Sequence, residues 1–269
     1  TGIGNNALMS CTTNSNNTSV GQNSLLYATG SANVAVGTRV MDASSCTATH
    51  CTAIGDEAMT SLTSGSTNTA VGNSVMALTT TGTNNVAMGN TAMYTNTTGS
   101  SNVAIGRDSM KLNTTGGHNI AIGYEAMYTN TTESLSVAVG YQALKNATAG
   151  GNVAIGREAL LANTTGTLNT AMGRDSGYMI TTGYRNTCIG VLAGNNITTG
   201  ILNTCLGEYS AASSATVNYE ITLGGPNVTG LRCQVTSISA LSDRRDKTDI
   251  NTLDLGLDFI KALKPVKFK

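Results

Sequence analysis

Five carboxylates recur at one position of a repeating sequence, and paired carboxylates are the groups that hydrolyse glycosidic bonds. Each stands two residues after a regularly spaced glycine: Glu57, Asp108, Glu125, Glu158 and Asp175. If successive repeats stack as neighbouring strands, Glu158 and Asp175 lie about 5 Å apart, near the separation in a retaining glycosidase. Three of the five carboxylates, however, directly follow an arginine. The sequence therefore favours a ladder of exposed ion pairs, each worth little, over a catalytic pair.

The cysteines and histidines do not form a convincing metal or disulfide site. Cys188 and Cys205 replace a small alanine in adjacent repeats, so we interpret them as small buried apolar residues. Parallel side chains in such a ladder are poorly placed for a disulfide. Cys46, His50 and Cys51 cluster in the one 18-residue repeat, which we interpret as an inserted loop. We expect neither a metal nor a cofactor.

The composition excludes several classes of protein. Of the 269 residues, 40% are hydrophobic but only 11% are charged and 4% aromatic, whereas an average domain is about a quarter charged. The net charge is zero, which argues against binding nucleic acid, and no apolar run approaches the roughly 18 residues of a membrane span. Without tryptophan, the surface available for stacking sugars is small. Tyr124 and Tyr141 occupy equivalent places in adjacent repeats, and we expect them to form a stacked patch.

A glycine recurs at almost constant spacing, and this repeat determines the fold. The intervals are 17 residues, apart from two of 16 and one of 18. A glycine after a short β-branched run suits a turn that needs a positive φ. The fourteen positions are Gly4, Gly21, Gly37, Gly55, Gly72, Gly89, Gly106, Gly123, Gly140, Gly156, Gly173, Gly190, Gly207 and Gly224.

Each repeat contains a short alternating segment, of which Asn102-Val103-Ala104-Ile105-Gly106 is typical. Alternation places the two β-branched residues on one face of a strand and the alanine on the other. The alanine column is either a contact between rods or a filler of a thin interior. A second apolar column, of methionine and leucine, follows four residues after the glycine, and Thr-Thr-Gly indicates a second turn.

A strand–turn–strand–turn unit of this kind cannot bury its own apolar face, and stacking successive units does so. The sequence therefore predicts an all-β chain, a parallel β-solenoid (β-roll) of about 13 coils with a 17-residue period. At about 4.8 Å between stacked strands, the rod would be roughly 60 Å long.

The Asn-Val-Ala-Ile-Gly element resembles the head repeats of trimeric autotransporter adhesins. Those repeats form left-handed parallel β-rolls that assemble as trimers. The resemblance covers residues 1–224 and implies a trimeric rod on a surface, although the adhesin repeat is usually shorter than 17 residues.

The composition changes near Ser242, where 12 of the 30 charged residues fall in the last 28 residues. Ser242-Asp243-Arg244-Arg245-Asp246-Lys247 is followed by apolar residues at helical spacing and by Pro265-Val266-Lys267-Phe268. This pattern resembles the start of the C-terminal intramolecular chaperone of endosialidase-type phage tailspikes and fibres. The resemblance implies self-cleavage between Leu241 and Ser242, with Ser242 as the nucleophile and Lys247 as its partner. By spacing alone, Ser242 would be a capping residue and Lys247 a solvated side chain.

We therefore expect a β-solenoid over residues 1–224, transition strands over 225–241, and a truncated chaperone start with helical content over 242–269. The resemblances imply a homotrimeric tail fibre of a bacteriophage, extracellular on the virion, that attaches to the host. Its partners would be its own copies, other virion tail proteins, and a host-surface receptor, either a glycan or an outer-surface protein. We expect neither nucleic-acid binding nor membrane insertion, and no enzymatic activity apart from the autoproteolysis. The alternatives are a bacterial trimeric surface adhesin and, third, a tailspike glycan depolymerase.

Overall fold

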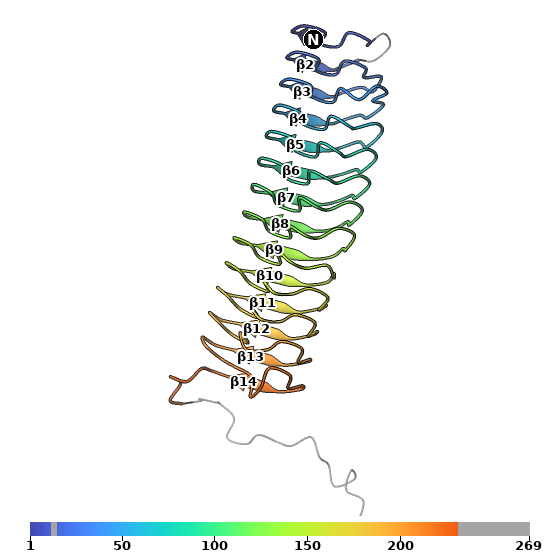
Figure 1. The fold of residues 1–269 in the computed structure, drawn as a ribbon. Helices are drawn as coiled ribbons and strands as arrows, with labels where there is room; N and C mark the ends of the chain where they lie inside the picture. Colours follow the sequence, from blue (N-terminus) through green and yellow to red (C-terminus); the bar gives the residue numbers. More distant parts are fainter. Residues whose placement is uncertain (12–14, 231–269) are drawn as a thin grey trace, which may run out of the picture. The chain divides into compact units, whose positions relative to one another are not determined.

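The computed structural model describes residues 1–11 and 15–230, and this part of the chain is a solenoid of about 13 turns (Figure 1). Fourteen short parallel strands form one sheet whose order follows the chain, so each strand pairs only with its predecessor and its successor. The described residues contain no helix. The strands are β1 (Gly2–Ile3), β2 (Thr18–Val20), β3 (Val34–Val36), β4 (Thr52–Ile54), β5 (Thr69–Val71), β6 (Val86–Met88), β7 (Val103–Ile105), β8 (Ile120–Ile122), β9 (Val137–Val139), β10 (Val153–Ile155), β11 (Thr170–Met172), β12 (Thr187–Ile189), β13 (Thr204–Leu206) and β14 (Ile221–Leu223). The predicted all-β solenoid is confirmed.

The repeat glycine ends each strand for two physical reasons. From Gly4 to Gly207 its φ lies between 114° and 137°, which is the region that glycine enters at low cost. Successive glycines also stack closely. A Cβ built on Gly106 would lie 2.7 Å from the carbonyl carbon of Gly123 in the next coil. Any larger residue would therefore separate the coils at this point.

The alanine at the centre of each strand points into the solenoid. Ala104 pairs in register with Ala87 and Ala121, and all three are fully buried. The methionine and leucine column is buried with them, so long unbranched side chains and small ones fill a thin interior together. Of the two interpretations of the alanine column, the interior filler is therefore confirmed, and the contact between rods is wrong.

The expected second strand of each repeat is also wrong, because the methionine column lies in a turn. Met110 and Met127 have φ values of 47° and 51°, and the equivalent residues of the other coils resemble them. This left-handed conformation costs a non-glycine residue about 1–2 kcal/mol and curls the backbone instead of extending it. Burial of the long side chain offsets that cost.

Buried asparagines connect the coils at the residue before each strand. The Asn102 side chain donates from Nδ2 to the carbonyl oxygen of Gly116 (2.8 Å) and accepts at Oδ1 from the backbone N–H of Asn119 (2.9 Å). One side chain thus ties the start of a strand to the far turn of its coil and to the next coil. The same position is held by Asn17, Asn33, Asn68, Asn85, Asn102, Asn119, Asn152, Asn169, Asn186 and Asn203.

The solenoid forms a compact unit that extends from Thr1 to Val228. Its end lies close to the predicted limit at residue 224, and residues 225–230 contain no strand. The rest of the predicted transition (231–241) and the predicted chaperone start (242–269), with Ser242 and Lys247, lie outside the described residues.

Candidate functional site

The surface of residues 1–11 and 15–230 contains no pocket, so function in this part of the chain depends on open faces. Within the same residues, no group of three or more His, Cys, Asp or Glu side chains is placed to hold a metal ion. No helix in the described part is long and apolar enough to cross a membrane. Two faces have unusual compositions, and each follows from the repeat.

The first face, which we call the outer sheet face, consists of the first and third residues of strands β2 to β14. These 26 side chains point away from the interior, and 20 are apolar while six are threonine. Ile120 and Ile122 of β8, for example, are 38% and 36% exposed. Parallel sheets are normally covered on both faces, whereas this one is covered by its own chain on one face only. An uncharged apolar face of this length is typical of an association surface.

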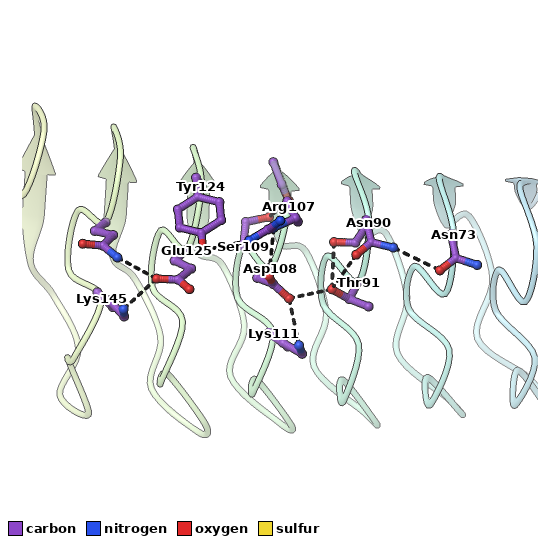
Figure 2. Close-up of polar contacts among 12 residues, drawn as sticks. Asn73, Asn90, Thr91, Arg107, Asp108, Ser109, Lys111, Tyr124, Glu125 and Lys145 are labelled. Carbon is purple, nitrogen blue, oxygen red and sulfur yellow. Dashed lines mark hydrogen bonds and ion pairs between the residues drawn. The ribbon is translucent and has the colours of Figure 1, made fainter.

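The second face, which we call the charged edge, lies on the turns that follow strands β7 to β11 (Figure 2). Asp108 is bound by Lys111 (Nζ to Oδ1, 2.8 Å) and by Arg107 (Nε to Oδ2, 3.3 Å). Glu125 is bound by Lys145 of the next coil (Nζ to Oε2, 2.6 Å). The charged edge comprises Arg107, Asp108, Lys111, Tyr124, Glu125, Tyr141, Lys145, Arg157, Glu158, Arg174 and Asp175.

The ion-pair interpretation of the repeated carboxylates is confirmed. Arg157 binds Glu158 (Nη2 to Oε1, 2.7 Å), and Arg174 lies 3.8 Å (Nε to Oδ2) from Asp175. The neighbouring carboxylates of the glycosidase hypothesis are therefore each held by their own arginine. The arginines are the outer members of these pairs, since their side chains are 54% and 51% exposed while both carboxylates are 16% exposed.

Two pairings could not be inferred from adjacent residues. Glu57 forms its ion pair with Arg39, which occupies the same position in the preceding coil, and Glu125 forms its pair with Lys145 in the following coil. The missed signal is the 17-to-20-residue separation, which becomes a contact only when coils stack.

The carboxylates on the charged edge stay ionised. Burial alone would raise the pKa of Asp108, but hydrogen bonds from Lys111 and Thr91 outweigh it, so the pKa lies below its ordinary value. Glu125 follows the same pattern with Lys145 and Gln142. The pKa of Lys111 is raised by its hydrogen bond to Asp108. These shifts strengthen ion pairs, and they are opposite to the raised pKa of a general acid.

The predicted tyrosine patch is confirmed at the centre of the charged edge. The rings of Tyr124 and Tyr141 stack with centroids 5.3 Å apart and planes inclined by 15°. The Arg107 guanidinium lies 4.7 Å from the centroid of Tyr124, and its Nη2 donates to the Tyr124 hydroxyl (2.9 Å). Figure 2 shows Arg107 and Tyr124 on one side of the two carboxylates, with Lys111 and Lys145 on the other.

The cysteine interpretations agree with the burial. Cys188 and Cys205 are paired neighbours in β12 and β13 and are buried in the interior. A hydrogen bond with Cys205, together with burial, raises the pKa of Cys188. Burial raises the pKa of Cys46 to about 11, so its thiol stays protonated and is a poor metal ligand.

Comparison with models of protein families, with curated proteins and with solved structures found no match for this chain. The functional argument therefore depends on the repeat, the outer sheet face and the charged edge.

Proposed function

We propose that the chain belongs to a homotrimeric attachment fibre, the tail fibre of a bacteriophage, in which three solenoids associate through their outer sheet faces. The observation that carries the proposal is the composition of this face, which has no charged residue between β2 and β14. Its apolar side chains lie in line along the whole unit, so two parallel copies in register bring like columns together at every level. Burial of these columns stabilises the assembly by roughly 25 cal/mol for each Å² of apolar surface removed from water.

The number of subunits comes from the resemblance to adhesin head repeats, which implies three. A cyclic arrangement places all copies of a coil at one height, so each coil presents the same surface three times. Many shallow contacts with a host surface then combine through effective concentration, which suits a molecule without a pocket in its described part.

The molar mass of the 269-residue chain in solution tests the assembly. We expect about three times the 27.4 kDa of one chain, and expect Ile122→Asp to give a monomer with an unchanged circular dichroism spectrum. Met179→Asp is the matched control, because Met179 is also apolar and exposed but lies outside the outer sheet face. A wild-type monomer, or a trimer that tolerates Ile122→Asp, would overturn the proposal.

The C-terminal resemblance adds a self-cleavage step to the proposal. The intact mass of the complete gene product should correspond to cleavage between Leu241 and Ser242, and Ser242→Ala and Lys247→Met should each leave the chain uncut. An uncut wild-type product would remove Ser242 and Lys247 from the proposed mechanism while leaving the solenoid assembly unaffected.

A further inference from the structure

We infer that the charged edge binds an acidic polysaccharide that lies along the solenoid, with its carboxylates on the arginines and its sugar rings against Tyr124 and Tyr141. This inference deepens the proposed attachment function, on which it rests, by naming the chemistry of the receptor.

The distribution of residues is the first argument. Residues 1–230 contain seven Lys and Arg, and five of them take positions one or five residues after the repeat glycine. Five of the nine tyrosines take the same two positions. Neither the interior nor the outer sheet face uses these residue types, so the solenoid itself does not require them there. The tyrosines concerned are Tyr94, Tyr124, Tyr128, Tyr141 and Tyr178.

The spacing is the second argument. Arg107, Tyr124, Tyr141, Arg157 and Arg174 each follow the repeat glycine directly in five consecutive coils. Stacked coils are separated by about 4.8 Å, which is close to the length of one pyranose unit in an extended chain. A linear polysaccharide parallel to the axis therefore meets about one of these side chains per sugar, first a cation, then two aromatic rings, then two cations.

The charge is the third argument. The side chains of Arg107, Arg157 and Arg174 are 59%, 54% and 51% exposed, while their carboxylate partners are 14–16% exposed. The outermost groups are thus positive although the cluster is nearly neutral. Each guanidinium has five N–H donors, so donors remain for a ligand carboxylate, which arginine can bind with two parallel hydrogen bonds.

The tyrosines supply the apolar contact that a sugar ring needs. Tyr141 is 46% exposed, and its stacking on Tyr124 holds both rings in place without a ligand. Little side-chain freedom is then lost on binding. Nucleic acid fits this face less well, because the carboxylates beneath the arginines would repel its denser phosphate charge.

Affinity electrophoresis of the 269-residue chain tests the inference, with polygalacturonate and polysialic acid as acidic polymers and dextran as the neutral one. We expect retardation by at least one acidic polymer and none by dextran. Tyr141→Ala and Arg157→Gln should each weaken the binding at least tenfold. The matched controls are Tyr184→Ala and Arg185→Gln, which remove an exposed tyrosine and its neighbouring arginine outside the charged edge.

Three results would overturn the inference: no retardation by either acidic polymer, equal weakening by the control variants, or equal retardation by single-stranded DNA. The molar mass, measured on the same samples, separates this inference from the proposed function. Absence of binding by a trimer would contradict only the polysaccharide site, whereas binding by a monomer would contradict only the trimeric fibre.

Discussion

Gly194 and Cys188 share one space in the interior of the solenoid, because a Cβ on Gly194 would collide with the Sγ atom of Cys188. In most coils the same two positions hold a methionine or leucine and an alanine, as Leu160 and Ala154 do. The larger strand residue has thus been accommodated by the loss of the opposite side chain. Interior volume is conserved across each coil and not at each position.

Gly194→Ala should therefore destabilise the chain by about 1–3 kcal/mol, because it overpacks this space. In a Cys188→Ala background the same substitution should cost less, since Sγ is no longer there. Urea unfolding of the two single variants and the double variant measures the coupling. Strictly additive changes would mean that the two residues do not compete.

Asn163→Ile should stabilise the chain by about 1–3 kcal/mol. Asn163 is fully buried, and neither polar atom of its side chain has a hydrogen-bond partner among the described residues. Ile180 and Ile197 occupy the same place in the next two coils and are fully buried. Thermal or urea unfolding measures the change.

The matched control is Asn113→Ile, which should have the opposite sign. Asn113 donates to Oδ1 of Asn96 (2.7 Å) and accepts from Nδ2 of Asn130 (3.0 Å), so its loss leaves buried groups unpaired. If both variants were stabilised, the asparagine hydrogen bonds would contribute nothing to the solenoid.

Leu135→Gly should stabilise the chain by about 0.5–1 kcal/mol, although it removes an apolar side chain. Leu135 has a φ of 65° and is 70% exposed, so it bears the cost of a left-handed backbone with little burial in return. Gly151 already occupies the equivalent place in the next coil, with a φ of 76°. Leu135→Ala is the comparison in a melting experiment, because it removes the side chain but keeps the backbone cost. Equal melting temperatures for the two variants would refute the explanation.

Acid should destabilise the chain partly through Asp108. Its folded pKa lies below the ordinary value of 3.8, so its contribution is present above that pH and is lost as the pH falls through the folded pKa. Asp108→Asn should therefore reduce the loss of stability on acidification below about pH 4. Unfolding measured at a series of pH values gives this slope.

Asp42→Asn should change the slope in the other direction. Burial raises the pKa of Asp42 despite a backbone hydrogen bond and the charge of Arg39, so acidification relieves a cost there. Removal of that carboxyl should make the loss of stability on acidification larger. A change of the same sign in both variants would contradict the assigned shifts.

The period of the sequence predicts most of the fold, because a solenoid needs only a repeating unit. The alternation around Ala104 correctly separates two faces, but alternation alone does not say which face is inside. The decision depends on the width of the interior, which is set by Met110 across from it and by the left-handed turn that Met110 adopts. A methionine is not a residue from which a positive φ is expected, so a second strand was predicted instead.

The candidate surfaces were predictable to different degrees. Arg157 and Glu158 are adjacent in the sequence, and the stack of Tyr124 on Tyr141 follows from equal positions in neighbouring repeats. The role of Asn102 was missed, since a polar residue before a strand is usually interpreted as a turn residue. Its recurrence with the same period as the buried alanines was the available signal.

The chain order of the sheet has a mechanical consequence. Because each coil is hydrogen-bonded only to the coils before and after it, tension between the two ends of the solenoid is borne by one boundary at a time. We expect terminal coils to peel off singly, and each 17-residue coil lengthens the molecule by about 50 Å when it is drawn out. Stretched in this way, the solenoid yields in equal steps and absorbs work at each one, while the coils that have not yet peeled keep their shape.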